Sequence, residues 1–145
     1  MKRNYYDYLK EEFDQYQGDY DSYLHYSIDF FKLLCDLLDE DIASPDRNRI
    51  NAALAYFVSP LDVYPEDLHG PEGYTDDIYV CVLVLRDLRT KYKEIVDRCW
   101  AYDDRLSELL ELCYTRSSKK LDEWGLRQKT LKYSGLNELL PKEAQ

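Results

Sequence analysis

The chain contains few of the residues that interrupt helices. Its 145 residues include only five glycines and five prolines. Neither residue type occurs between Gly73 and Gly125, a stretch long enough for several consecutive helices. Because glycine and proline are the strongest local interruptions of regular structure, their scarcity predicts a largely helical protein with one substantial loop.

Basic residues are also scarce in this chain. Lys and Arg number 19 against 29 Asp and Glu, which gives a formal net charge of −10. Nucleic-acid phosphates and anionic lipid headgroups repel such a chain, so we expect neither nucleic acid nor a membrane as its partner. The acids are concentrated early, since residues 1–43 carry 11 acids and 4 bases. This excess would attract a protein partner with a basic surface, although solubility or pairing with the mildly basic residues 115–145 also explains it.

Signals of export, membrane insertion and thiol chemistry are missing as well. No run approaches the ~18 apolar residues of a membrane span, and the N-terminus has no apolar signal core, so we expect a cytoplasmic protein. The four cysteines contain no CxxC pair, and each falls within an apolar helical stripe. This pattern predicts buried thiols in a reducing compartment rather than a disulfide framework or a metal site.

Common catalytic motifs are absent too. The sequence has no glycine-rich phosphate loop, no HExxH and no GxSxG, and its only histidines are His25 and His69. Without a phosphate loop or the residues for a histidine-based triad, the sequence favours a protein that is not an enzyme.

What the sequence does contain is a series of helical stripes. Hydrophobic residues recur at intervals of three and four over residues 19–39, and Ser44-Pro45 is a typical helix start. Residues 78–85 are apolar on nearly every side, which predicts a central buried helix that begins near Thr75. Further helices are predicted over 92–113, 117–124 and 126–133, with a break near 87–91 and with ends at Gly125 and Gly135.

These stripes predict an all-α fold, a single compact helical bundle of about five to seven helices. The length fits one ordinary domain. We expect this domain to span residues 1–135, with residues 136–145 as a tail.

One motif stands out in the loop between two predicted helices. It reads Ser59-Pro60-Leu61-Asp62-Val63-Tyr64-Pro65, followed by Gly73-Tyr74-Thr75-Asp76-Asp77. The order of Ser59, Pro60, Pro65, Gly73 and the three aspartates resembles the signature of the YkvA-like family, a small bacterial and archaeal helical domain of unknown function. The resemblance covers about residues 48–86 and implies two apolar helices joined by a loop, without implying an activity. Many relatives have an apolar stretch after the second proline, whereas this chain has a polar one.

The acids of this motif suggest a candidate metal site. If the two flanking helices are antiparallel neighbours, Asp62 would converge with Asp76 or Asp77 at their shared end. Converging carboxylates bind Mg²⁺, Mn²⁺ or Ca²⁺ through oxygen, and His69 could add a nitrogen ligand. Such a site would also permit a metal-dependent hydrolase. Loop and helix-capping roles explain the same residues without any ligand, because carboxylates accept backbone N–H bonds in turns and at helix starts.

Tyrosine is frequent, with 15 copies. Five early ones are candidates for an interaction surface, namely Tyr5, Tyr8, Tyr16, Tyr20 and Tyr23. Tyrosine suits interfaces because it combines a large apolar face with a hydroxyl, and an exposed stripe of this kind is compatible with a homodimer. The alternative is that the rings cover the core while their hydroxyls reach water. The sequence thus predicts a non-enzymatic acidic interaction module, an adaptor or inhibitor, with a divalent-metal-binding domain as the alternative.

Overall fold

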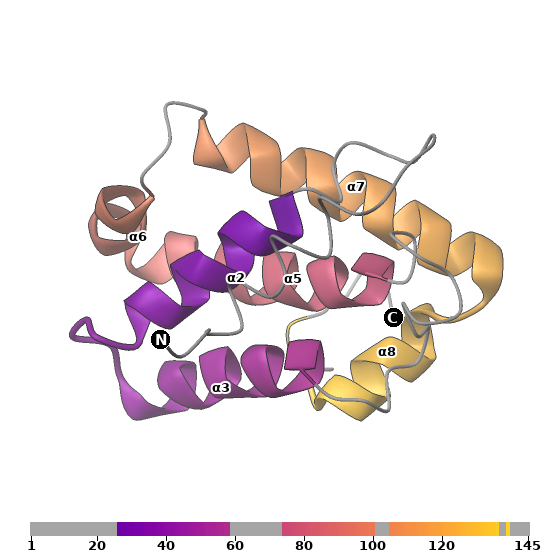
Figure 1. Cartoon of the computed structure of the whole chain (residues 1–145), viewed down its shortest axis with the longest axis horizontal. Coiled ribbons are helices and arrows are strands. Elements are labelled where there is room, and N and C mark those ends of the chain that lie inside the picture. The colour runs from indigo at the N-terminus through magenta and orange to yellow at the C-terminus, as the bar shows by residue number, and fades with distance from the viewer. Residues whose placement is uncertain (1–25, 59–73, 101–104, 137–138, 140–145) are drawn as a thin grey trace, which may run out of the picture.

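The computed structural model describes residues 26–58, 74–100, 105–136 and 139. These residues form six helices, and no strand occurs among them. In chain order the helices are α2 (Tyr26–Leu37), α3 (Ser44–Val58), α5 (Thr75–Lys91), α6 (Lys93–Cys99), α7 (Leu106–Trp124) and α8 (Arg127–Ser134), as Figure 1 shows. None of these described helices has the length and hydropathy that a membrane span requires. The predicted all-α fold is confirmed for this part of the chain.

Helix α5 forms the centre of the bundle. Every residue from Tyr74 to Leu85 is buried. Helices α2, α3 and α7 pack around α5, and α6 and α8 contact it as well (Figure 1). This arrangement confirms the prediction that a helix which is apolar on nearly every side lies in the middle of the core.

Aromatic rings join α2, α3 and α5 to one another. The ring of Phe57 lies 5.1 Å from that of Phe31 and 5.9 Å from that of Tyr74, measured between centroids. Trp100, which follows α6, lies 5.8 Å from Phe30 of α2. Such pairs contribute about 0.5–1.5 kcal/mol each beyond the area they bury. The chain thus folds α6 back onto α2 and closes the core on that side.

Glycine ends both α7 and α8, as the sequence predicts. Gly125 and Gly135 have φ angles of 70° and 73°, in the left-handed region that residues with a Cβ rarely adopt. After α7, Leu126 donates its backbone N–H to the carbonyl of Leu121 across 2.8 Å, and Gly125 donates to Asp122 across 3.1 Å. These two bonds satisfy carbonyls that the end of α7 would otherwise leave open.

Three predicted helix boundaries differ from the structure. The stretch predicted as a helix over 92–113 is divided, because α6 ends at Cys99, α7 begins at Leu106, and Trp100 has an extended backbone with φ −74° and ψ 113°. The break predicted near 87–91 lies at Tyr92, which separates α5 from α6. The helix predicted over 117–124 is not separate, because it forms the C-terminal part of α7. Ser117 donates its hydroxyl to the carbonyl of Cys113 across 2.6 Å, so its polar side chain is satisfied inside the helix and does not interrupt it.

The four thiols lie in the core or at its edge. Cys81 and Cys113 are buried, Cys35 and Cys99 are half-buried, and none forms a disulfide. Burial raises the pKa of all four thiols, that of Cys113 to about 12. Because the thiolate is the nucleophile and the metal ligand, a raised pKa disfavours both roles at neutral pH. The prediction of buried thiols is confirmed for Cys81 and Cys113.

Two leucines after α8 also pack on the core. Leu136, the first residue of the predicted tail, is 1% exposed and packs against the main cluster of buried residues. Leu139 packs partly against the same cluster. The apolar side chains at the start of this segment therefore contribute to the core.

Candidate functional site

The motif links α3 to α5, and the structure describes its last part. The predicted site residues that lie outside the described residues are Asp62, His69, Ser59, Pro60, Pro65, Gly73, Tyr5, Tyr8, Tyr16, Tyr20 and Tyr23. Their roles stay predictions. Asp76 and Asp77 are described, and they lie in the first turn of α5.

Asp76 and Asp77 are buried between helices. Both residues are 0% exposed. Tyr56 of α3 donates its hydroxyl hydrogen to Oδ2 of Asp76 across 2.6 Å. The helix dipole also favours negative charge in the first turn of α5. Asp76 therefore connects α3 with α5, which supports an architectural role for this carboxylate.

A metal site is not complete within the described residues. Across 26–58, 74–100 and 105–136, no group of three or more His, Cys, Asp or Glu side chains could hold a metal ion. The other predicted ligands, Asp62 and His69, lie outside the described residues. The metal site therefore stays a prediction.

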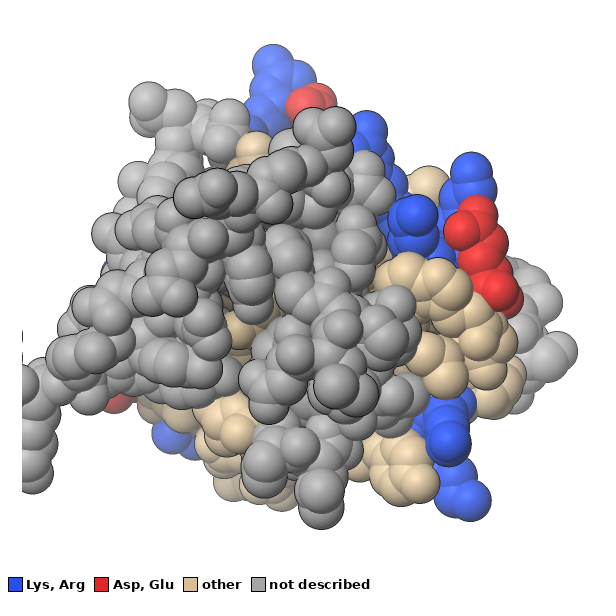
Figure 2. Space-filling model, turned by 45° about the vertical axis from the view of Figure 1, so that its right-hand side comes forward, with Lys and Arg blue, Asp and Glu red and all other residues tan. Residues whose placement is uncertain are grey.

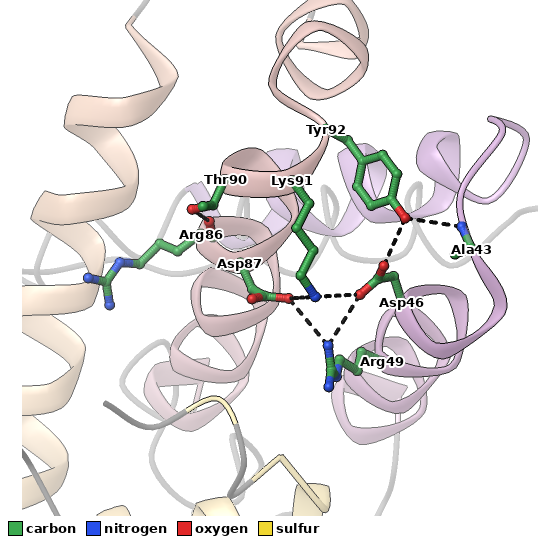
Figure 3. A network of polar contacts seen from close by, with 8 residues as sticks. All are labelled: Ala43, Asp46, Arg49, Arg86, Asp87, Thr90, Lys91 and Tyr92. Atoms are coloured by element: carbon green, nitrogen blue, oxygen red, sulfur yellow. Dashed lines mark hydrogen bonds and ion pairs between the residues drawn. The ribbon is translucent and has the colours of Figure 1, made fainter. Parts of the chain in front are cut away.

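A cluster of charged side chains joins the start of α3 to the end of α5. We call it the Asp46 cluster, and it comprises Asp46, Arg49, Asp87, Lys91 and Tyr92 (Figure 3). Oδ1 of Asp46 accepts hydrogen bonds from Lys91 across 2.9 Å and from Arg49 across 3.2 Å. Oδ2 of Asp87 lies 3.0 Å from Lys91 and 3.5 Å from Arg49. Two carboxylates and two cations thus alternate, and their charges cancel.

Tyr92 closes this cluster against the N-terminus of α3. Its hydroxyl donates to Oδ2 of Asp46 across 2.8 Å and accepts the backbone N–H of Ala43 across 3.2 Å. The hydrogen bond from Lys91 holds the pKa of Asp46 below its usual value, and it does so against the opposing effect of burial. Hydrogen bonds to Asp46 and Asp87 raise the pKa of Lys91. Both shifts favour the charged forms of Asp46 and Lys91, and the cluster links the start of α3 to the end of α5.

A second set of polar contacts, made by Arg127, joins α8 to α5 and α7. Arg127 donates to the hydroxyls of Tyr79 and Tyr114 across 2.9 and 2.8 Å, and to Asp122 across 3.1 Å. The rings of Tyr79 and Tyr114 stack with centroids 6.0 Å apart. The guanidinium of Arg86 lies over the ring of Tyr114, 3.9 Å from its centroid. The rings of Tyr79 and Tyr114 lie against the core, as the alternative interpretation of the tyrosine content predicts. Their hydroxyls bond to Arg127, whereas that interpretation expected them to reach water.

Neither the Asp46 cluster nor the contacts of Arg127 were predicted from the sequence. Asp87 and Lys91 are four residues apart on one helix, and this spacing alone is a readable signal for an ion pair. Tyr92 and Asp46 are separated by 46 positions, so no local pattern connects them.

Comparisons with known proteins place the chain in a family. Residues 49–83 match the family model described as "Protein of unknown function (DUF1232)", inside the segment where the motif resembles the YkvA-like family. The chain is 39% identical over 132 residues to "Uncharacterized protein ORF9" of Methanothermobacter thermautotrophicus. The aligned region covers 89% of this chain and 88% of that protein. The chain belongs to the family of this archaeal protein. The predicted resemblance is thereby confirmed at the level of a domain of unknown function.

Other relatives resemble the chain over a short segment only. The chain is 48% identical over 44 residues to the E3 ubiquitin-protein ligase RNF170 of Xenopus laevis. These 44 residues make up 30% of this chain and 17% of that protein. RNF170 of Danio rerio is 46% identical over 44 residues, 30% of this chain and 16% of that protein. No solved structure matches the chain. A segment of this size therefore recurs inside much longer proteins.

Proposed function

We propose that the chain is a non-enzymatic helical interaction module, an adaptor or an inhibitor, that binds a protein with a basic surface. The distribution of charge carries this proposal. The described residues include 15 acids and 15 bases, so their formal charges cancel. The net charge of −10 is therefore carried entirely by residues outside the described ranges.

The described helices use many of their charges internally. Ion pairs join Glu40 to Arg98 and Asp97 to Arg89. The Asp46 cluster is neutral as well. Figure 2 shows one face of the molecule, on which Lys and Arg side chains occupy more of the described surface than Asp and Glu side chains do. The acids outside the described helices are thus not required to neutralise the scaffold, and they are suited to steer and orient a basic partner.

The recurrence of a 44-residue segment in RNF170 supports a modular role. There the segment makes up less than a fifth of a protein named as an E3 ubiquitin-protein ligase. In this chain the described carboxylates of the motif, Asp76 and Asp77, are buried, and Asp76 bonds to Tyr56. A motif that stabilises a helical hairpin is reusable in proteins of different function.

Affinity capture with charge variants tests the proposal. The first variant removes four acids of the motif loop through Asp62→Asn, Glu66→Gln, Asp67→Asn and Glu72→Gln. The matched control removes four exposed acids of the described helices and turns through Asp39→Asn, Asp41→Asn, Glu94→Gln and Glu123→Gln. We expect the full chain and the control to capture the same basic protein, and the loop variant to lose it.

The purified partner then has to bind in a titration whose affinity falls steeply with salt, because the Debye length shrinks from about 8 Å at physiological ionic strength to about 3 Å at 1 M. Equal capture by both variants would overturn the proposal, as would affinity that does not change with salt. Both variants must keep the melting temperature of the unmodified chain for the comparison to count.

A divalent-metal site is the second candidate function. The observation in its favour is that Asp76 and Asp77 are consecutive residues in the first turn of α5, and that they follow Asp62 and His69 closely in the sequence. Binding of Mg²⁺, Mn²⁺ or Ca²⁺ would raise the melting temperature through linkage, and Asp62→Asn would abolish the rise. A melting temperature that stays constant up to millimolar metal would rule out this candidate.

A further inference from the structure

A cleft of about 460 Å³ lies between α5 and α7. Its apolar lining comes from Leu83 and Leu110, which are 3% and 2% exposed, and from Leu139. Thr90 and Ser107 place hydroxyl groups at the same cleft. This volume lies in the range of sites for small organic molecules, and most of the side chains that line the cleft are charged or polar.

Three cations line the cleft, and they share two carboxylates. Nε of Arg86 donates to Glu111 across 2.9 Å. Arg89 donates to Asp97 through two nitrogens, across 2.8 and 3.2 Å. Nζ of Lys93 lies 3.8 Å from the same Asp97, which is too long for a hydrogen bond. The group therefore carries one positive charge more than its carboxylates balance.

Asp87 also lines the cleft, but its charge is balanced elsewhere. Its carboxylate is held by Lys91 and Arg49 within the Asp46 cluster. In Figure 3 the side chain of Arg86 points away from this cluster and toward the neighbouring helix α7. Asp87 is therefore shared by the neutral Asp46 cluster and the cleft lining, and its charge does not offset that of Arg86, Arg89 and Lys93.

Several hydrogen-bond donors at the cleft have no acceptor among the described residues. Within the described part of the chain, Arg86 uses only Nε, so its two terminal nitrogens have no protein acceptor. Lys93 and the hydroxyl of Ser107 have no hydrogen-bond acceptor there either. The ring of Tyr114 fixes the guanidinium of Arg86, since the two lie 3.9 Å apart. A ligand with a carboxylate would supply the missing acceptors and the missing negative charge.

We propose that this cleft binds a small organic carboxylate. Its apolar body lies on Leu83 and Leu110, and its carboxylate accepts hydrogen bonds from Arg86 and Lys93. One excess positive charge fits a monoanion, and the apolar floor favours an aliphatic or aromatic acid over inorganic phosphate. The site is separate from the interaction proposed above, because none of its lining residues belongs to the motif loop.

Titration of the isotopically labelled chain with hexanoate and benzoate, followed by amide chemical shifts, tests this site. Hexanamide, benzamide and inorganic phosphate serve as the comparison ligands. For ligands of this size we expect dissociation constants on the order of millimolar. Shifts should cluster at Thr90, Ser107 and Leu110, and the amides should bind at least about tenfold more weakly, because they lack the charge.

Lys93→Gln is the decisive variant, with Lys132→Gln on α8 as its matched control. Both lysines are exposed, so both variants should fold. Lys93→Gln should weaken carboxylate binding by roughly two- to fivefold, because an exposed charge pair is worth little. Lys132→Gln should leave it unchanged. The proposal fails if no saturable shift appears, if the amides or phosphate bind as well as the carboxylates, or if the two variants behave alike.

Discussion

Tyr92 donates a hydrogen bond to Asp46 across 2.8 Å, although 46 positions separate the two residues in the chain. The same hydroxyl accepts the backbone N–H of Ala43, so one side chain from the α5–α6 junction satisfies the start of α3. Helix starts leave backbone N–H groups without intrahelical partners, and a residue near in sequence usually satisfies them. Here a distant tyrosine does so, which couples the end of α5 to the beginning of α3.

Removal of this hydroxyl should therefore destabilise the whole bundle. We expect Tyr92→Phe to lower the free energy of unfolding by about 1–2 kcal/mol, because Asp46 and the N–H of Ala43 both lose a partner. Urea denaturation followed by circular dichroism measures the change. Tyr133→Phe is the control, since Tyr133 is 65% exposed and its change should stay within about 0.5 kcal/mol. Equal effects of the two variants would contradict the coupling.

The Asp46 cluster should make stability depend on acid pH. The pKa of Asp46 is lowered in the folded protein from its usual value of 3.8, so the folded state binds fewer protons than the unfolded state. Its contribution is fully present above about pH 5 and is lost as pH falls through the lowered pKa. Unfolding free energies measured from pH 7 down to acid should therefore decline. Asp46→Asn should flatten this decline, while Asp39→Asn, at an exposed position, should leave it intact.

Tyr56 and Asp76 should be coupled energetically. Their hydrogen bond is 2.6 Å long and both residues are buried, so neither partner is readily satisfied by water after substitution. We expect Tyr56→Phe to cost about 1–3 kcal/mol of unfolding free energy. A double-mutant cycle with Asp76→Asn should give a coupling energy of about 0.5–3 kcal/mol. Additive effects of the two substitutions would show that the bond contributes nothing to stability.

Much of this fold can be predicted from the sequence because its signals are local. Residues 78–85 are apolar on all sides, and a helix of this kind has to lie in the middle of a bundle. Gly125 ends α7 because it adopts a left-handed conformation that a residue with a Cβ avoids. In each case the physical cause lies within a few neighbouring residues.

The side-chain contacts between helices could not be predicted in the same way. Arg127 reaches Tyr79, 48 positions away, and Lys91 reaches Asp46, 45 positions away. Each contact depends on how two helices are rotated and placed, which no local pattern specifies. The motif aspartates were visible in the sequence, but the partner of Asp76 on α3 depends on the same placement of helices.

The end of α7 offers a test of the glycine argument. Gly125 has no heavy atom near the position that a Cβ would take, so a substitution there meets backbone strain and no clash. Gly125→Ala should cost about 1 kcal/mol of unfolding free energy. Gly125→Asn should cost less, because asparagine tolerates the left-handed region better. Alanine and asparagine variants of equal stability would contradict this account.

Arg127 should control the local stability of α8. Its guanidinium bonds to two tyrosine hydroxyls and to Asp122, and its side chain is 20% exposed. Arg127→Gln should remove the charged guanidinium and leave the buried hydroxyl of Tyr79 without this donor. It should lower the free energy of unfolding by about 1–3 kcal/mol. Hydrogen exchange should then show loss of protection in α8 before any loss in α3. Arg105→Gln is the matched control, because Arg105 is 81% exposed and pairs only with its neighbour Glu108 among the described residues. A uniform loss of protection over all helices would show that Arg127 supports the whole bundle instead of one helix.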